Sequence, residues 1–270
     1  MEKLIITLAH TGNVPTKQMN PNTPVTPKEI AKDIVTCADL GIAVAHIHVR
    51  DEKEKPTSKR ELFQEVLKLL DEENVDVIRQ LSTGARGGEN TIDWRGQMLD
   101  LNVEMASLST GSSNFPTSVN ANSPELIEAL AQRMKDHGIK PEIEAFDLAM
   151  ISNAEYLMKK GVLNGPLHFN LVMNVPGSIK GTPRNLLYMI ESLPKGSTWS
   201  LTAVGRSHVQ LATMAIVMGG HVRTGLEDVV EMSPGILASN TELVKRIIQI
   251  AKATGREIAT PDEARRILSL

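Results

Sequence analysis

The chain has 270 residues, of which 41% are hydrophobic and only 3% aromatic, so it can build a sizeable core from aliphatic side chains. Its net charge of −3 and pI near 6.2 argue against nucleic acid or an anionic membrane as its main partner. One cysteine, Cys37, allows no intrachain disulfide and fits a reducing compartment. With no signal-peptide-like N-terminus and no apolar run of about 18 residues, we expect a cytoplasmic protein without membrane spans.

Short apolar segments with β character recur along the chain, and helical patterns lie between most of them. The expected strands cover residues 4–9, 43–49, 75–82, 103–109, 141–147, 167–173, 198–204 and 220–227. Helix start signals, a serine or threonine directly before a proline, occur at Thr26, Ser123, Thr182 and Thr260. Regular apolar spacing predicts further helices over residues 59–74 and 240–255.

Eight strand–helix units in about 250 residues are the usual size of a (β/α)8 TIM barrel. No break in composition marks a domain boundary, so we expect one α/β domain over residues 1–270. A doubly wound open sheet is the alternative. It would carry a G-x-G-x-x-G turn after its first strand, and the segment AHTGNVPT (9–16) does not match that pattern.

Two histidines end the second expected strand. Because a strand alternates faces, His46 and His48 point the same way and form a natural two-nitrogen chelate for a metal. The alternative is a pair of partly buried histidines that bond to the backbone. Glu227 ends the eighth strand, which only the first strand separates from the second in a closed barrel. It is therefore expected to complete a site of two histidines and one carboxylate for zinc or another divalent metal.

Asp228 follows Glu227 directly and points elsewhere, which leaves it free to act as a base. Arg223 is close in sequence and is expected to keep Asp228 charged and oriented. An ordinary surface Arg–Asp pair would explain the charges. It would not explain the clustered glycines of GGHVRTGLED (219–228), which suggest close backbone approach.

Polar residues end the other expected strands as well, where the active site of a barrel lies. They are Ser82, Thr83 and Gly84 after the third strand, Ser107, Ser109 and Thr110 in the fourth, Glu144 in the fifth and Asn170 in the sixth. The hydroxyls either bind a substrate carboxylate or cap helices. Lys180, in the Gly-rich segment 174–185, and Arg206 lie near expected helix starts and are candidates for phosphate contacts.

Over nearly its whole length the chain resembles the β-keto acid cleavage enzymes. The resemblance rests on the segments PVTPKEIAKDI, HIHVRD, QLSTG, MASLSTGSSNF, KPEIEAFD, GGHVRTGLED, LASNTELV and ATPDEAR. It implies a TIM barrel with a divalent metal, usually zinc, bound by His46, His48 and Glu227. It further implies that Asp228 is the catalytic base oriented by Arg223, and that Ser82, Ser107 and Glu144 match other strand-end residues of the family's site.

The resemblance implies a reaction of a β-keto acid with acetyl-CoA that yields acetoacetate and a new acyl-CoA. Lys180 and Arg206 are then expected to contact the phosphates of CoA, and the protein is expected to be a homo-oligomer, either a dimer or a tetramer. A zinc-dependent hydrolase or class II-type aldolase on the same barrel is one alternative. A non-catalytic binding barrel is another, although the intact set of polar residues argues against it.

The loop after the first strand predicts the charge of the substrate. Asn13 and Val14 are expected to overhang the site and contribute to substrate binding, and this loop contains no carboxylate. A buried cationic amine would require one, because an unpaired buried charge is costly. We therefore expect a neutral β-keto acid of modest size rather than an aminated one.

Overall fold

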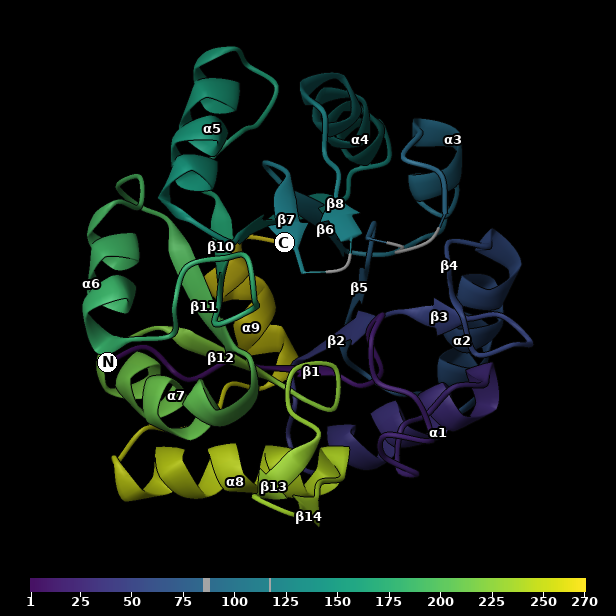
Figure 1. Ribbon diagram of the computed structural model, residues 1–270, viewed down its shortest axis with the longest axis vertical. Helices are drawn as coiled ribbons and strands as arrows, with labels where there is room; N and C mark the ends of the chain where they lie inside the picture. Colours follow the sequence, from purple (N-terminus) through teal and green to yellow (C-terminus); the bar gives the residue numbers. More distant parts are fainter. Residues whose placement is uncertain (85–87, 117) are drawn as a thin grey trace.

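The computed structural model describes residues 1–84, 88–116 and 118–270. Eight parallel strands close into a barrel in the order β1-β12-β11-β10-β9-β6-β5-β2, with helices around the outside (Figure 1). This confirms the predicted (β/α)8 barrel and excludes the open sheet. The barrel strands are β1 (Ile6–Ala9), β2 (Val44–Ile47), β5 (Ile78–Leu81), β6 (Met105–Ser109), β9 (Lys140–Ala145), β10 (His168–Met173), β11 (Thr198–Ala203) and β12 (His221–Thr224).

The predicted helix starts are also confirmed. The hydroxyl of Thr26 accepts the N–H of Glu29, whose carboxylate accepts the N–H of Thr26, and this capping box begins the first long helix. Ser123, Thr182 and Thr260 cap later helices in the same position. The helices are α1 (Pro27–Ala38), α2 (Arg60–Glu72), α3 (Ile92–Arg95), α4 (Pro124–Asp136), α5 (Leu148–Lys159), α6 (Pro183–Glu191), η1 (Gly205–Ser207), α7 (His208–Val217), α8 (Asn240–Ala253) and α9 (Pro261–Leu268).

Apolar side chains fill two regions around the strands. The larger core lies between the barrel and its helices and includes Phe63 and Phe169. A smaller cluster around Ile5, Val44 and Met105 joins Leu268 of α9 and closes the end of the barrel where the strands begin. Buried polar side chains also occur along the barrel strands, from His168 and His221 at strand starts to Thr202 and Arg223 near strand ends. Others are Gln80, Ser107, Glu142 and Asn170.

The structure differs from the sequence prediction where the last barrel strand ends. The strand was expected to reach residue 227, but β12 ends at Thr224. Gly225 follows with φ +145°, and a Cβ there would lie 2.1 Å from the carbonyl oxygen of Ala9. Only glycine permits so close an approach of the two backbones. Glu227 and Asp228 therefore lie on a tight loop and not on the strand.

Three short hairpins, which were not predicted, extend the loops between barrel strands and helices. They pair β3 (Val49–Arg50) with β4 (Pro56–Thr57), β7 (Ser113–Phe115) with β8 (Ser118–Asn120), and β13 (Glu231–Ser233) with β14 (Ile236–Leu237). Each pair is too short for a strand pattern to emerge from the sequence. Within the described ranges, no helix combines the length and the apolar character that a bilayer crossing needs.

Candidate metal centre and active site

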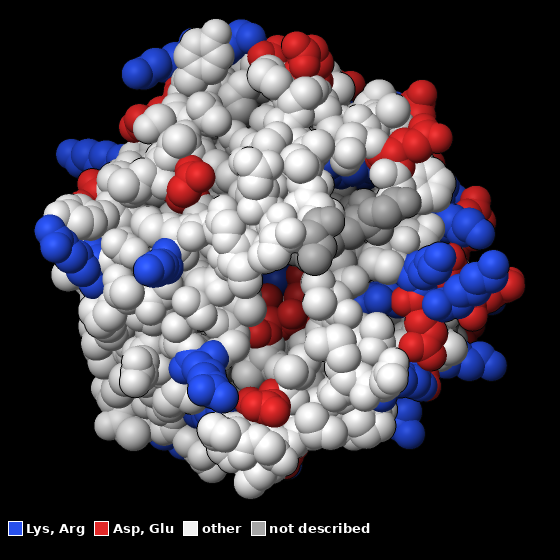
Figure 2. Space-filling model, viewed as in Figure 1, with Lys and Arg blue, Asp and Glu red and all other residues white. Residues whose placement is uncertain are grey.

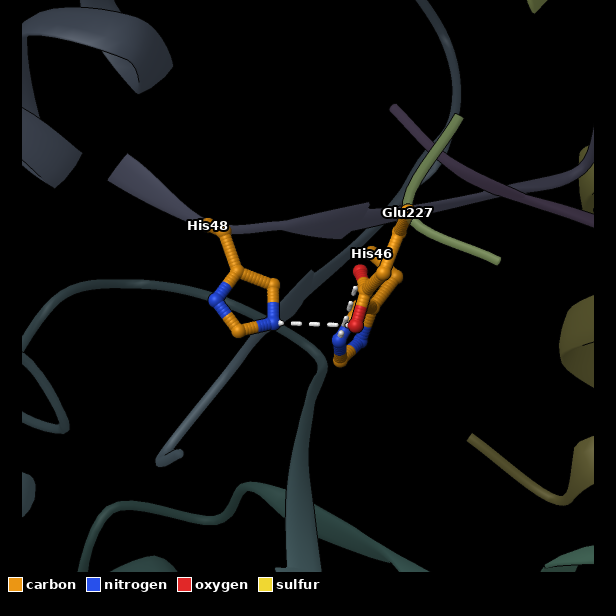
Figure 3. Close-up of side chains that lie close together, drawn as sticks. All are labelled: His46, His48 and Glu227. Atoms are coloured by element: carbon orange, nitrogen blue, oxygen red, sulfur yellow. Dashed lines mark ion pairs between the residues drawn. The ribbon is translucent and has the colours of Figure 1, made fainter. Parts of the chain in front are cut away.

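Three potential metal ligands meet at the end of the barrel where the strands finish. His46 comes from β2, His48 follows this strand directly, and Glu227 comes from the loop after β12 (Figure 3). One ligand atom from each residue lies within 4.8 Å of the others. The Nε2 atoms of His46 and His48 lie 3.9 and 3.4 Å from the carboxylate of Glu227. The arrangement offers two nitrogens and one oxygen to a single point.

The hydrogen bonds of this cluster fit a metal ion. Within the described residues, the buried atoms His46 Nε2 and Glu227 Oε2 have no hydrogen-bond partner. His46 Nδ1 lies 2.5 Å from Gln80 Oε1, and an amide oxygen can only accept, so Nδ1 carries the proton. The lone pair of Nε2 is then free to bind a cation. Two histidine nitrogens and a carboxylate are ligands that zinc takes readily, with open positions left for a substrate.

Close packing of two backbone segments sets the position of Glu227. Its N–H donates to the carbonyl oxygen of Ala9 at the end of β1. Gly12 adopts φ +60°, and a Cβ at this position would lie 2.2 Å from Cγ of Glu227. The glutamate side chain therefore occupies the space that any other residue at position 12 would fill. The sequence folds this way because glycine stands on both sides of the contact, at positions 12 and 225.

One arginine contacts three carboxylates beside the metal ligands. Arg223 of β12 makes two hydrogen bonds to Asp228, at 2.9 and 3.0 Å. It also contacts Glu227 at 2.8 Å and Glu144 of β9 at 3.2 Å. With all three carboxylates ionised, the formal charge of this group is −2, which a divalent cation would balance.

The pKa values in this cluster diverge. Burial raises the pKa of Asp228 to about 6, against the opposing effect of Arg223. Burial also raises the pKa of Glu144. Burial disfavours the charged form of Glu227 too, but Arg223 and His48 hold its pKa well below its usual range. Burial and the charge of Arg223 lower the pKa of His46, which keeps its ring neutral. A neutral imidazole with an ionised carboxylate suits a metal site, and Asp228 remains as an acceptor for a proton.

A cavity of about 370 Å³ opens above this cluster. Figure 2 shows acidic side chains at the bottom of a hollow in this face of the molecule. His48, Glu144, Arg223, Glu227 and Asp228 form the polar end of the cavity. Its other walls are mostly apolar and are made by Val14, Phe115, Pro116, Phe146, Val172, Val175, Pro176 and Val204. The site therefore pairs one charged end with a largely apolar chamber.

The structure brings several other predicted substrate residues to this cavity. Asn13, Val14, Ser82 and Gly84 line it, and Asn13 Nδ2 donates to the carbonyl oxygen of Gly84. Ser109 also lines it and donates to Glu144. The loop after β1 thus overhangs the site as expected.

Several predicted residues lie outside the cavity lining; besides the proposed metal ligand His46, they are Thr83, Ser107, Thr110, Asn170, Lys180 and Arg206. Thr83 and Ser107 are buried and bond to each other, because the Thr83 hydroxyl donates to the Ser107 carbonyl oxygen at 2.8 Å. Lys180, in the loop before α6, and Arg206, in η1, are exposed. Arg206 lines a second cavity of about 360 Å³. Gly205 also lines this second cavity, and the preceding residue, Val204, lines the first.

Sequence reasoning missed most of the apolar wall, of which it had predicted Val14, and three polar residues, Gln80, Asn120 and Asn240. Phe115 lies in the β7–β8 hairpin, where no strand-end rule selects it, and Phe146 directly follows β9, but only polar residues were collected at strand ends. Gln80 could have been found, since it lies two residues before Ser82 and so faces the same side of its strand. Asn240 bonds to the loop before Glu227, and only its place in the segment LASNTELV drew attention to it.

Comparison with known proteins gives consistent matches. A family model described as beta-keto acid cleavage enzyme matches residues 3–270. The 3-keto-5-aminohexanoate cleavage enzyme of Fusobacterium nucleatum subsp. nucleatum is 44% identical, with 100% of this chain and 99% of the relative covered. The 3-oxoadipate:acetyl-CoA acetyltransferase of Cupriavidus necator is 38% identical, with 98% of this chain and 94% of the relative covered. The solved apo structure of ObcA has a TM-score of 0.82 at 20% identity, covers 93% of this chain and 66% of that chain, and supports the fold alone.

Proposed function

This chain belongs to the β-keto acid cleavage enzyme family, and from that premise we propose that it converts a β-keto acid and acetyl-CoA into acetoacetate and a new acyl-CoA. The observation that carries the proposal is the meeting of three metal-type ligands with an arginine-held carboxylate in one cavity. His46, His48 and Glu227 would hold a divalent cation, with zinc the ion that this donor set favours. A cation bound there would supply a Lewis acid for the oxygens of the substrate.

The residues beside the proposed metal site divide the work of proton transfer. Asp228 takes a proton from the carbon between the keto and carboxylate groups, and Arg223 holds it in place through two hydrogen bonds. The carbanion attacks the thioester carbon of acetyl-CoA, a carbon–carbon bond forms, and the CoA thiolate leaves. The thiolate then adds to the original keto carbon, and the carbon–carbon bond beside it breaks. Acyl-CoA and the acetoacetate enolate result, and Asp228 returns the proton to carbon.

Hydrogen-bond donors around the cavity suit the negative charge that develops in these steps. Ser82 lines the cavity, and Arg223 reaches it from the barrel interior. Such donors stabilise an oxyanion most where water is excluded. Glu144 contacts Arg223 and helps to hold its guanidinium in place.

We further propose that bound CoA extends out of the cavity toward Arg206 and Lys180, which would contact its phosphates. The support is charge and position, because both cations are exposed on segments that follow barrel strands. Arg206 lines the neighbouring cavity, which starts one residue after the wall of the first. Assembly as a dimer or tetramer and a cytoplasmic location remain predictions from the sequence.

We propose a neutral β-keto acid of modest size as the substrate. The carboxylates of the cavity lining, Glu144, Glu227 and Asp228, all contact Arg223, so none is available for a substrate amine. Val14 stands where the overhanging loop meets the cavity, among other apolar side chains. The relatives do not decide this point, since two of them are named for an aminated acid, 3-keto-5-aminohexanoate, and another is named for 3-oxoadipate.

The test is a coupled assay of the purified protein with acetyl-CoA and a panel of β-keto acids. We expect acetoacetate to form only when acetyl-CoA is present, and kcat/KM to be higher for a neutral acid than for its amino-substituted isostere. Turnover without acetyl-CoA would favour the hydrolase or aldolase alternative. A clear preference for the amine would contradict the argument from the apolar wall, and a metal-loaded protein without turnover would favour a binding barrel.

A further inference from the structure

One buried side chain at the start of α8 ties together the segments around the proposed metal centre. Asn240 donates from Nδ2 to the carbonyl oxygen of His10, at 2.9 Å, and to Oδ2 of Asp33, at 2.5 Å. Its Oδ1 accepts the N–H of Leu226 at 2.7 Å. The three partners belong to the residue after β1, to α1, and to the loop residue directly before Glu227.

We propose that Asn240 is a positioning residue for Glu227 and Asp228, and that Asp33 fixes the orientation of its amide. The inference rests on the proposed metal site. The loop that carries Glu227 leaves the barrel after β12. Its other anchors include the bonds from Glu227 N–H to the Ala9 carbonyl oxygen, from Gly205 N–H to the Asp228 carbonyl oxygen, and from Arg223 to the Asp228 carboxylate. Asn240 holds this loop and the end of β1 at a common point, and the same two segments form the tight contact at Gly12.

The hydrogen-bond roles at Asn240 allow only one orientation of its amide. Oδ1 faces an N–H donor, and Nδ2 faces two acceptors, the His10 carbonyl and the Asp33 carboxylate. A reversed amide would set its amino group against the Leu226 N–H and its oxygen against two acceptors. Asp33 therefore specifies the orientation that supports the loop.

Asp33 is otherwise hard to account for. It is half-buried, and none of the ion pairs found among the described residues includes it. Burial raises the pKa of Asp33 to about 6, and the Asn240 hydrogen bond opposes this rise. A partly desolvated carboxylate without a cationic partner costs stability, so its only described bond, to Asn240, identifies its use.

The test compares zinc affinity in Asn240→Asp, Asp33→Asn and the double variant, by competition with a chelator. Asn240→Asp sets a carboxylate against Asp33 and the His10 carbonyl, and we expect a 10- to 100-fold loss of affinity, the range for groups that orient ligands. Asp33→Asn alone is isosteric and is expected to lose up to about 10-fold. The double variant should recover part of the affinity, because the introduced amide can donate to the introduced carboxylate.

A matched control separates positioning from general stability. Arg256 is another buried residue that donates to several carbonyls, including those of Glu2 and Ile216, but at the opposite end of the barrel. Arg256→Met should lower the melting temperature and leave zinc affinity unchanged. If Asn240→Asp and Asp33→Asn also bind zinc like the wild type, the positioning role is overturned. If the wild type itself binds no divalent metal, the proposed metal site fails, and this inference fails with it.

Discussion

Replacing Gly12 with alanine should damage the proposed metal site, although all three proposed ligand residues stay in the sequence. Position 12 has φ +60°, so an alanine costs about 1–2 kcal/mol in backbone strain. Its Cβ would also lie 2.2 Å from Cγ and 2.8 Å from Cβ of Glu227, so the whole glutamate must move. A displaced ligand should weaken zinc binding by at least about 100-fold, which corresponds to about 2.7 kcal/mol.

A second glycine supplies the control for backbone strain. Gly138 has φ +67°, and a Cβ there meets nothing within 4 Å. Gly138→Ala should therefore lose a similar amount of stability in thermal unfolding and bind zinc like the wild type. Zinc affinity would be measured by competition with a chelator for both variants. Equal zinc affinity in Gly12→Ala and Gly138→Ala would refute the reasoning, since it would mean that Glu227 is not a ligand or that the loop yields without cost.

Three further outcomes are expected. His46→Ala should lose most of the metal that the wild type carries, as elemental analysis would show, and full retention would remove it from the ligand set. Asp228→Asn should keep metal and fold but lose at least about 100-fold in kcat, because the amide preserves shape and removes the base; near wild-type turnover would direct attention to Glu144. The pKa of Asp33 is raised from 3.8 to about 6 in the folded state, so folding favours the protonated form. The free energy of unfolding should therefore fall as pH rises between about 4 and 6, by up to about 3 kcal/mol. Asp33→Asn should lack that loss in urea unfolding series at pH 4 and pH 7, and an unchanged pH dependence would contradict the assignment.

The fold could be predicted because its signals are local and repeated. Helix caps such as Thr26 and Ser123 bond to backbone groups within four residues, and each apolar segment predicts a strand without reference to the rest of the chain. His46 and His48 could be placed side by side for the same reason, since two residues on one strand share a face, and their role as metal ligands stays a prediction. Glu227 was expected near them from the closed order of the strands, although on the strand itself and not on the loop after β12.

Features that depend on contacts distant in sequence could not be predicted. The eighth strand was drawn too long because Gly225 packs against Ala9, more than two hundred residues earlier. The apolar wall arises from hairpins and turns, such as Phe115 and Phe146, whose positions depend on the assembled barrel. Asn240 has no distinguishing local pattern, and its three bonds all reach other elements.

The place of β1 between β2 and β12 would link metal binding at the proposed site to the closure of the ring. The histidines lie on one side of this seam and Glu227 on the other, so a cation that binds all three bridges early and late parts of the chain. By mass action, such a cation stabilises the closed ring against any state in which the last strand has detached. During synthesis, the nascent chain cannot complete the proposed site until residue 227 has left the ribosome, by which point seven of the eight barrel strands and all of β12 have been made.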